Sequence, residues 1–455
     1  MIRQELRLLM RDSLLVWVGL FVAAIFAVSF WSGASEKRSL LRKTNESHSV
    51  IERQRSELLN AMKKIEAGST ERFVPDPTSA SAVPRRMNPY VLKLQERLAI
   101  TAIGEGDVRP SLVRLGNPMD PTYVQDDVVS PLAMASGRLD LVFGVVVLIP
   151  LGVIAMMFRM FSGEKEAGVL PLIQSGERSL WYLLAERSFL RFACLSLFVG
   201  LSFVAGLALT QTSPGLELII QWLFVVVSYL GFWFALCFFV SCFQWTTGAN
   251  LVILISAWLF LVVLVPAIAN LVVSKAHKGP LPISTRMKLR ATMEHGEADV
   301  AEVRQFYLDY GLNGFEDDNL PARSLALRNL ALKQVLPDML ALRNSAIRRE
   351  QSLSIIGLFN PATLANEHLV RLAGKDGASF RDFEDYLVRE NDRRFRHFLP
   401  LRLNRTRLSL NDYREIPSVS VQTRRQSQVS FSSVSILGWC LALAAASAFA
   451  VRNKQ

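Results

Sequence analysis

The most conspicuous chemically active side chains in this sequence form a short run of alternating charge, Glu164, Lys165 and Glu166. The run closely follows a long apolar segment, and Gly168 comes after it and allows a tight turn. The stretch 163–179 is typical of an amphipathic element on a membrane surface, with its charged side chains facing water. Its apolar face consists of Val169, Leu170, Leu172 and Ile173.

The other reactive side chains form no catalytic, nucleotide-binding or metal-binding pattern in the sequence. The patterns GxxxxGK[ST], HExxH, CxxC and GxSxG do not occur. The five histidines lack the pairing of a metal site, and the four cysteines all lie in apolar segments. We therefore expect no catalytic residue, no cofactor and no metal, and we expect the chain not to be an enzyme. These residues are His48, His277, His295, His368, His397, Cys194, Cys237, Cys242 and Cys440.

Apolar residues make up 51% of the 455 residues, and they are concentrated in blocks that alternate with charged stretches. A helix of roughly 20 apolar residues crosses the hydrocarbon layer, and a spanning segment must be helical to satisfy its backbone polar groups. The sequence therefore predicts six spans, with kinks at Pro150 in the second and Pro266 in the fifth. They are 14–31, 139–161, 189–209, 216–243, 251–273 and 434–451.

The first span has an alternative interpretation as a cleaved signal peptide, because arginines precede it and the small residues 32–34 follow it. The apolar stretch is long for a signal peptide, and Phe30 and Trp31 crowd the cleavage point. We favour an uncleaved span, preceded by an amphipathic elbow at residues 2–10.

Lysine and arginine in the short loops indicate the orientation. They precede the first span, lie between the second and third spans and follow the sixth, whereas the loop 211–215 has none. The N-terminus, the second loop and the C-terminus are thus predicted to face the cytoplasm, and the two long segments to face outward.

The predicted architecture is an all-α polytopic membrane protein with six transmembrane helices and two mainly helical (α or α+β) periplasmic insertions. Residues 1–33 form the elbow and first span, and residues 138–273 form the second to fifth spans. Residues 34–137 and 274–430 form the two periplasmic domains, and residues 431–455 form the sixth span and the tail.

The interiors of the predicted spans carry essentially no ionisable residue, whereas ion-coupled transporters and intramembrane enzymes need such groups at depth. Any transport by this chain is therefore expected to draw its free energy from outside the chain. The net charge of +11 is explained by basic residues at helix ends and in the polar segments. Because no basic run is interleaved with aromatic residues, we expect no nucleic-acid partner.

The stretch 163–179 resembles the pattern of ABC type-2 permeases, in which an acidic-basic-acidic start leads to Gly-Thr-Leu, a Leu-rich turn and Ser-Pro-x-Ser-Arg. Val169, Pro171 and Gly176 depart from that pattern, and Glu186-Arg187 replaces a common Gly-Lys. The six-span layout with large outward segments after the first and fifth spans is similar to one branch of the family. The matching residues are Glu164, Lys165, Glu166, Gly168, Leu170, Leu172, Ser175, Arg178 and Ser179.

The resemblance implies that residues 163–180 are a coupling helix, which docks into a separate ATPase subunit. Its ATPase-coupling residues would be Glu164, Lys165, Glu166, Gly168, Leu170, Leu172 and Arg178. The implied function is a permease of an ATP-driven exporter in the inner membrane. The implied partners are a cytoplasmic ABC ATPase, a second permease (the same or a sister chain), membrane lipid and a periplasmic partner. The alternative is a membrane-anchored protein that passes ATPase motion to periplasmic partners without transport.

Overall fold

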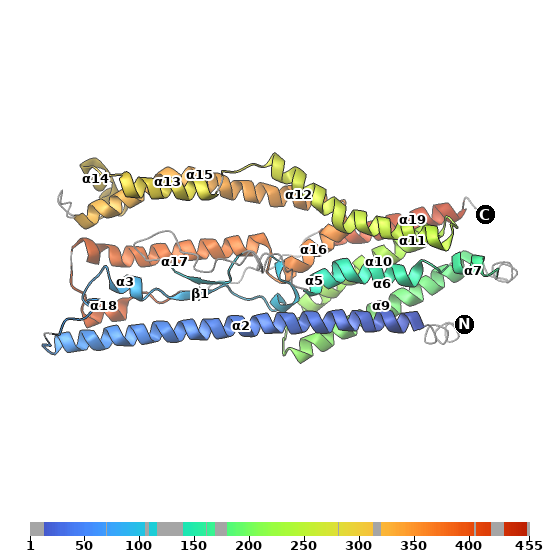
Figure 1. Ribbon diagram of the computed structural model, residues 1–455, viewed down its shortest axis with the longest axis horizontal. Coiled ribbons are helices and arrows are strands. Elements are labelled where there is room, and N and C mark those ends of the chain that lie inside the picture. The colour runs from blue at the N-terminus through green and yellow to red at the C-terminus, as the bar shows by residue number, and fades with distance from the viewer. Residues whose placement is uncertain are drawn as a thin grey trace.

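The structure is a computed structural model, and it describes residues 13–69, 71–104, 109–115, 140–160, 162–168, 180–280, 282–312, 320–404, 406–419 and 432–452. The molecule is elongated and mainly helical (Figure 1). Long apolar helices gather at one end, which we call the apolar end, and charged helices and a small sheet form the other, the polar end.

Five helices among the described residues are long and apolar enough to cross a membrane, so the chain has the architecture of a multi-pass membrane protein. The first lies within α2 (Ser13–Glu66), and the second combines α5 (Leu141–Phe143), η3 (Gly144–Leu148) and α6 (Ile149–Met157). The third and fourth are α9 (Leu180–Leu209) and α10 (Leu216–Ser241). The fifth combines α11 (Thr247–Trp258), η4 (Leu259–Leu264) and α12 (Val265–Ala276).

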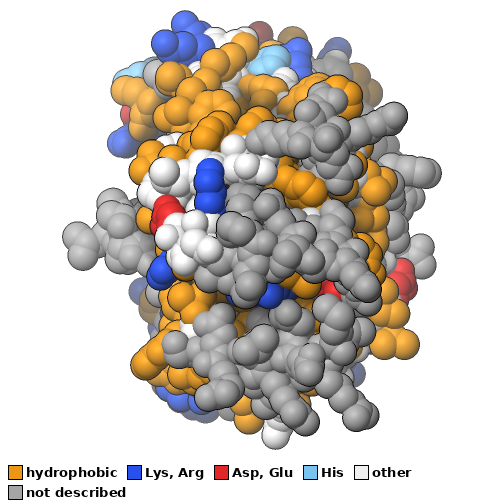
Figure 2. All heavy atoms as spheres, turned by 90° about the vertical axis from the view of Figure 1, so that its right-hand side faces the viewer, with side chains coloured by type: hydrophobic (Ala, Val, Ile, Leu, Met, Phe, Trp, Pro, Cys, Tyr) orange, Lys and Arg blue, Asp and Glu red, His pale blue; other side chains and the backbone are white. Residues whose placement is uncertain are grey.

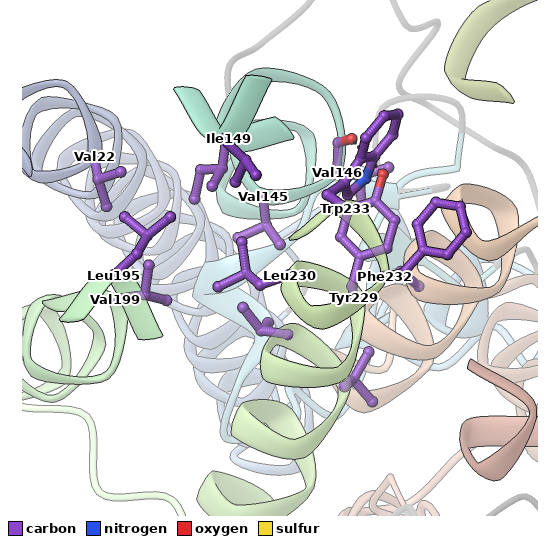
Figure 3. Close-up of a cluster of buried hydrophobic side chains, with 14 of the residues drawn as sticks. Val22, Val145, Val146, Ile149, Leu195, Val199, Tyr229, Leu230, Phe232 and Trp233 are labelled. Carbon is purple, nitrogen blue, oxygen red and sulfur yellow. Dashed lines mark hydrogen bonds between the residues drawn. The ribbon is translucent and has the colours of Figure 1, made fainter. Parts of the chain in front are cut away.

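These helices share one hydrophobic core, which Figure 3 shows in part. Val22 of α2 faces Leu195 and Val199 of α9 there, while Ile149 of α6 and Leu230 of α10 point toward the same space. Nearer the polar end, Phe203 of α9 stacks on Trp222 of α10, with ring centroids 3.7 Å apart. The second and fourth of the five helices are more than half buried in these contacts, which fixes their positions.

The two predicted proline kinks occur as π-helical segments, η3 just before Pro150 and η4 just before Pro266. Proline has no N–H, so the carbonyl groups one turn earlier lose their usual donor. Side chains from other elements supply it: Tyr229 Oη donates to Val146 O (2.8 Å), and Asn360 Nδ2 donates to Leu261 O (2.7 Å). The kinks are therefore satisfied by tertiary contacts.

Helix α2 differs from the predicted pattern, in which the first span ends at residue 31 and a separate periplasmic domain begins at residue 34. The structure has one continuous helix of 54 residues, so the predicted boundary at residues 33 and 34 falls inside it. Residues 32–38, around this boundary, contain no proline, and their single glycine, Gly33, costs a helix only about 1 kcal/mol. At 1.5 Å per residue α2 is about 80 Å long, far more than a membrane requires.

The polar end is built from both long polar segments. The first segment contributes α3 (Val83–Arg86), β1 (Tyr90–Leu92), η1 (Ala99–Thr101) and β2 (Leu112–Arg114). Strands β1 and β2 pair antiparallel, with Val91 opposite Val113. The second contributes α13 (Pro282–His295), α14 (Val300–Asp309), α15 (Leu320–Gly357), α17 (Gly377–Leu403) and α18 (Leu410–Glu415).

The two polar segments share hydrophobic cores. Val91 and Val113 of the sheet pack against Phe383 and Leu387 of α17. At the far end of α2, Leu58 and Met62 pack with Val83, Leu408 and Tyr413. Residues before the second span and after the fifth thus form a single body in the described structure.

Ion pairs connect α13, α15 and α17, and α15 and α17 also share a hydrophobic core with α14 that includes Leu325 and Phe398. Lys288 of α13 binds Asp338 of α15 at 2.6 Å, and Arg343 of α15 holds both carboxylate oxygens of Asp385 of α17 at 2.5 and 2.7 Å. Such bidentate pairs are the stronger kind of surface ion pair.

Two further apolar helices lie against the span bundle. Helix α16 (Pro361–Leu372) begins with Asn360 as its N-cap and buries Leu364, Ala365 and Leu369 against α10 and its neighbours. Helix α19 (Ser432–Arg452) covers the predicted sixth span and packs along α10, although its described apolar part, Ser435–Ala450, is shorter than the five long helices.

Candidate functional site at the apolar end

The charged run lies in and beside α7 (Ser162–Glu166), a short helix that follows the second apolar helix. Figure 1 places α7 at the tip of the apolar end, on the same side as the first residues of α2 and the last residues of α19. Figure 2 looks onto this tip and shows acidic and basic side chains close together, with hydrophobic side chains along much of the rim. The described helix ends at Glu166, and Gly168 follows with a φ of +71°.

Glu164 connects α7 to the third apolar helix. Its carboxylate forms an ion pair with the Arg187 guanidinium, and the two side chains are only 26% and 22% exposed. One turn further along α9, Arg191 donates to the carbonyl oxygen of Met156 in α6. The prediction that Glu164 faces water is therefore wrong, because its carboxylate is turned inward toward a cation from α9.

Lys165 and Glu166 connect α7 to the turn between the fourth and fifth apolar helices. Lys165 Nζ donates to Gln244 O at 3.0 Å. The Thr247 backbone N–H donates to Glu166 Oε1 at 2.8 Å, and the Thr247 hydroxyl lies 2.9 Å from Oε2. The same hydroxyl is 2.8 Å from Ser162 Oγ. Both Lys165 and Glu166 remain exposed, as the sequence predicts.

Glu166 sits where a carboxylate stabilises a helix. Helix α11 begins at Thr247, after Thr246, whose hydroxyl accepts from Ala249 N–H. The first N–H groups of a helix have no hydrogen-bond partner inside the helix. The positive end of the helix dipole also lies at this terminus and attracts anions. Glu166 therefore acts as a cap supplied from another element, and it ties α7 to the start of the fifth apolar helix.

Three consecutive side chains thus reach three different places: the third apolar helix, the turn after the fourth, and the start of the fifth. The sequence indicated Glu164, Lys165 and Glu166, and in the structure each of them contacts a different element. Of the other predicted coupling residues, Gly168 lies in the turn after α7, whereas Leu170, Leu172 and Arg178 lie outside the described residues.

Sequence analysis missed the residues that receive the charged run: Arg187, Gln244 and Thr247. One signal was present, since Thr246 and Thr247 precede an apolar helical run and are typical of a helix start. The structure also places Asn250 near this site, in the second turn of α11. Its side chain is 1% exposed, and neither its amide nitrogen nor its oxygen has a hydrogen-bond partner among the described residues.

Metal chemistry has no visible support in the described part of the chain, where no three His, Cys, Asp or Glu side chains form a group that could hold an ion. Comparison with protein-family models, curated proteins and solved structures found no match to this chain.

Proposed function

We propose that this chain is the membrane-spanning permease subunit of an ATP-binding cassette exporter in the inner membrane. The observation that supports the proposal is the position of Glu164, Lys165 and Glu166. They join the segment after the second apolar helix to the ends of the third, fourth and fifth. A push on that segment would move the ends of these helices together.

In this proposal residues 163–180 dock into a separate cytoplasmic ATPase, which hydrolyses ATP. Dimerisation of the ATPase displaces α7, and Glu164 and Glu166 carry the displacement to α9 and α11. The spans then exchange between inward-open and outward-open arrangements, so that the ATPase shifts a conformational equilibrium. Two permeases, identical or sister chains, complete the transporter, and lipid surrounds them.

The topology belongs to the same proposal. Helix α19 is the sixth span, at 21 residues long enough to cross most of the hydrocarbon layer. The tip with α7 and the ends of α2 and α19 faces the cytoplasm, and the polar end faces the periplasm. The substrate enters between the spans and leaves toward the polar end.

The first test uses Glu166→Lys in the full chain, purified in detergent with whatever ATPase accompanies it. The substitution places a cation at the positive end of α11, so that α7 is repelled from the helix it normally caps. We expect the ATPase to copurify as before, and ATPase activity to lose most of its stimulation by the permease. The measurement is ATP hydrolysis per complex, with and without the permease.

The matched control is Glu46→Lys, the same charge change at an exposed position of α2 in the polar half. A second variant, Gly168→Pro, changes the turn after α7, because proline cannot adopt the φ of +71° found there. The coupling role would be ruled out if Glu166→Lys and Gly168→Pro both stimulated ATP hydrolysis as strongly as the wild type does. Purification of the chain without any ATPase would also rule it out.

One observation favours the alternative function, in which the chain passes ATPase motion to periplasmic partners without transport. Helix α2 runs unbroken from the apolar end to the far tip of the polar end, so it can act as a rigid rod. Reconstitution separates the two functions. Movement of a substrate into sealed vesicles supports export, whereas ATP-dependent binding of a periplasmic protein without such movement supports mechanical transmission.

A further inference from the structure

A cavity of about 620 Å³ lies where the apolar end meets the polar end, far from α7. Its walls come from α2 just beyond the first span, from residues 92–100, from the turn 211–213 between the third and fourth apolar helices, and from the loop before α17. A volume of this size is in the range of small-ligand sites.

The cavity is lined by more positive than negative side chains. Four cations and two carboxylates face it, which leaves an excess of two positive charges: Lys37, Lys93, Arg97, Lys375, Glu36 and Glu96. Lys93 and Lys375 are each only 4% exposed. The Lys375 ammonium lies 3.9 Å from a carboxylate oxygen of Glu36.

The Lys93 side chain is held in place by a backbone carbonyl group and an aromatic ring. Its ammonium donates to the carbonyl oxygen of Gly374 at 2.7 Å and lies 4.8 Å from the centre of the Phe380 ring. Burial, followed by the charge of Lys375, lowers the pKa of Lys93 to about 8. The two lysines are thus kept near each other in a wall that favours a bound negative charge.

The wall itself is a close-packed structure. A Cβ at Gly33 would lie 2.1 Å from the backbone oxygen of Ile100, so only glycine lets α2 approach η1 this closely. Gly374 has a φ of +64°, which favours glycine, and a Cβ there would meet the side chain of Glu96. This close packing fixes the backbone beside Lys375 and along the wall of the cavity.

The surface next to the cavity, at the ends of the apolar helices, carries exposed apolar side chains. Leu209 and Leu216 flank the turn 211–213 and are 86% and 71% exposed, and Trp31 of α2 is 70% exposed. The Arg97 guanidinium lies beside Gly215, at the start of α10. A molecule with a charged head in the cavity could therefore lay an apolar tail along the span ends.

We propose that this cavity binds an anionic phosphate group, carried by a membrane lipid whose tails lie against the exposed span ends. The basic side chains pair with the phosphate oxygens, as ammonium and guanidinium groups do in phosphate sites. The same chemistry would accept a soluble phosphate. The proposal needs the membrane-spanning architecture only, and it does not depend on any ATPase.

The test measures binding to the full chain in an uncharged detergent, by calorimetric titration without ATP. The probes are dihexanoyl-phosphatidylglycerol, which is anionic, dihexanoyl-phosphatidylcholine, which is zwitterionic, and inorganic phosphate. The variant is Lys37→Gln with Arg97→Gln, because both side chains are exposed and can change without disturbing the fold. The control is Arg53→Gln with Lys63→Gln, exposed positions of α2 about 24 Å or more further along the helix.

We expect phosphatidylglycerol to bind the wild type and the control with the same affinity. Its affinity for the Lys37 and Arg97 variant should be lower by about tenfold or more, because that variant lacks two charged contacts. Competition by inorganic phosphate with the same residue dependence would still support a phosphate site and assign it to a soluble ligand. Equal binding of phosphatidylcholine, or wild-type affinity in the variant, would overturn the proposal, as would failure of both phosphate probes to bind. Since no ATPase is present, these outcomes leave the permease proposal untouched.

Discussion

At the scale of single residues, several cationic side chains in the polar half are buried, and burial disfavours their charged form. Arg394 is 1% exposed and donates to Met87 O at 3.2 Å, and burial lowers its pKa to about 10. At Lys93, burial acts together with the charge of a second ammonium group, that of Lys375. Such groups cost stability in their charged form, and the cost depends on pH.

We predict that the chain becomes more stable as pH rises from about 8 to 10, and that Lys93→Met removes part of this rise. The folded-state pKa of Lys93, about 8, lies below its ordinary value of 10.5. Between these values the folded chain releases the proton first, so the unfolded chain binds more protons and stability increases with pH. The acidic groups facing Lys93 are Asp376, Glu96 and Asp382, and Lys375 opposes them.

The check is the melting temperature in detergent at a series of pH values. After allowance for solvent screening, the Lys93 contribution is on the order of 2 kcal/mol. Parallel pH profiles for wild type and Lys93→Met would show that the ammonium is better solvated than its burial implies.

At the scale of elements, α2 is the main connection between the two ends of the molecule. It contributes to the span core through Val22 and Phe26 and to the far core through Leu58 and Met62. Between these it touches η1 at Gly33. A movement at one end of α2 can reach the other end only if the contact between Gly33 and η1 stays close.

Two alanine substitutions in α2 test that contact against helix propensity. Gly19→Ala places a methyl group 3.8 Å from the Phe198 ring, an ordinary contact, and should stabilise the helix by about 1 kcal/mol. Gly33→Ala adds the same methyl group 2.1 Å from Ile100 O, so we expect a net loss of about 1–3 kcal/mol. Thermal unfolding of the two purified variants gives the comparison, and a stabilised Gly33→Ala would mean that α2 and η1 do not pack as described.

At the scale of the whole molecule, α7 and the polar body lie at opposite ends of a long structure with the apolar helices near α7. A bilayer around those helices would separate the two ends. Export and mechanical transmission both need this separation, because each passes a movement from one side of the membrane to the other.

Cysteine labelling measures the separation in a background with the four native cysteines replaced by alanine. We expect Glu46→Cys to react with a membrane-impermeant maleimide in spheroplasts, and Ala167→Cys to react only after lysis. Both positions are exposed in the structure, so each is able to react. Equal labelling of the two without lysis would place them on the same side and end the proposed topology.

The sequence by itself determined the five long apolar helices and the places where two of them deviate from regular α-helix. Lipid offers no partner to a backbone, so a long apolar run must form a helix, and a proline at Pro150 or Pro266 must disturb it. It also indicated Glu164, Lys165 and Glu166 as a group with a special role. These are local properties, fixed by residues within a few turns of one another.

Only the tertiary structure decided what those side chains touch. Glu164 meets Arg187, 23 residues away, and Lys93 meets Gly374, 281 residues away. It also decided that α2 continues past the membrane and that two polar segments share their cores. Packing between distant segments sets these contacts, and hydrophobic burial is non-directional, so no local pattern of residues specifies which surfaces meet.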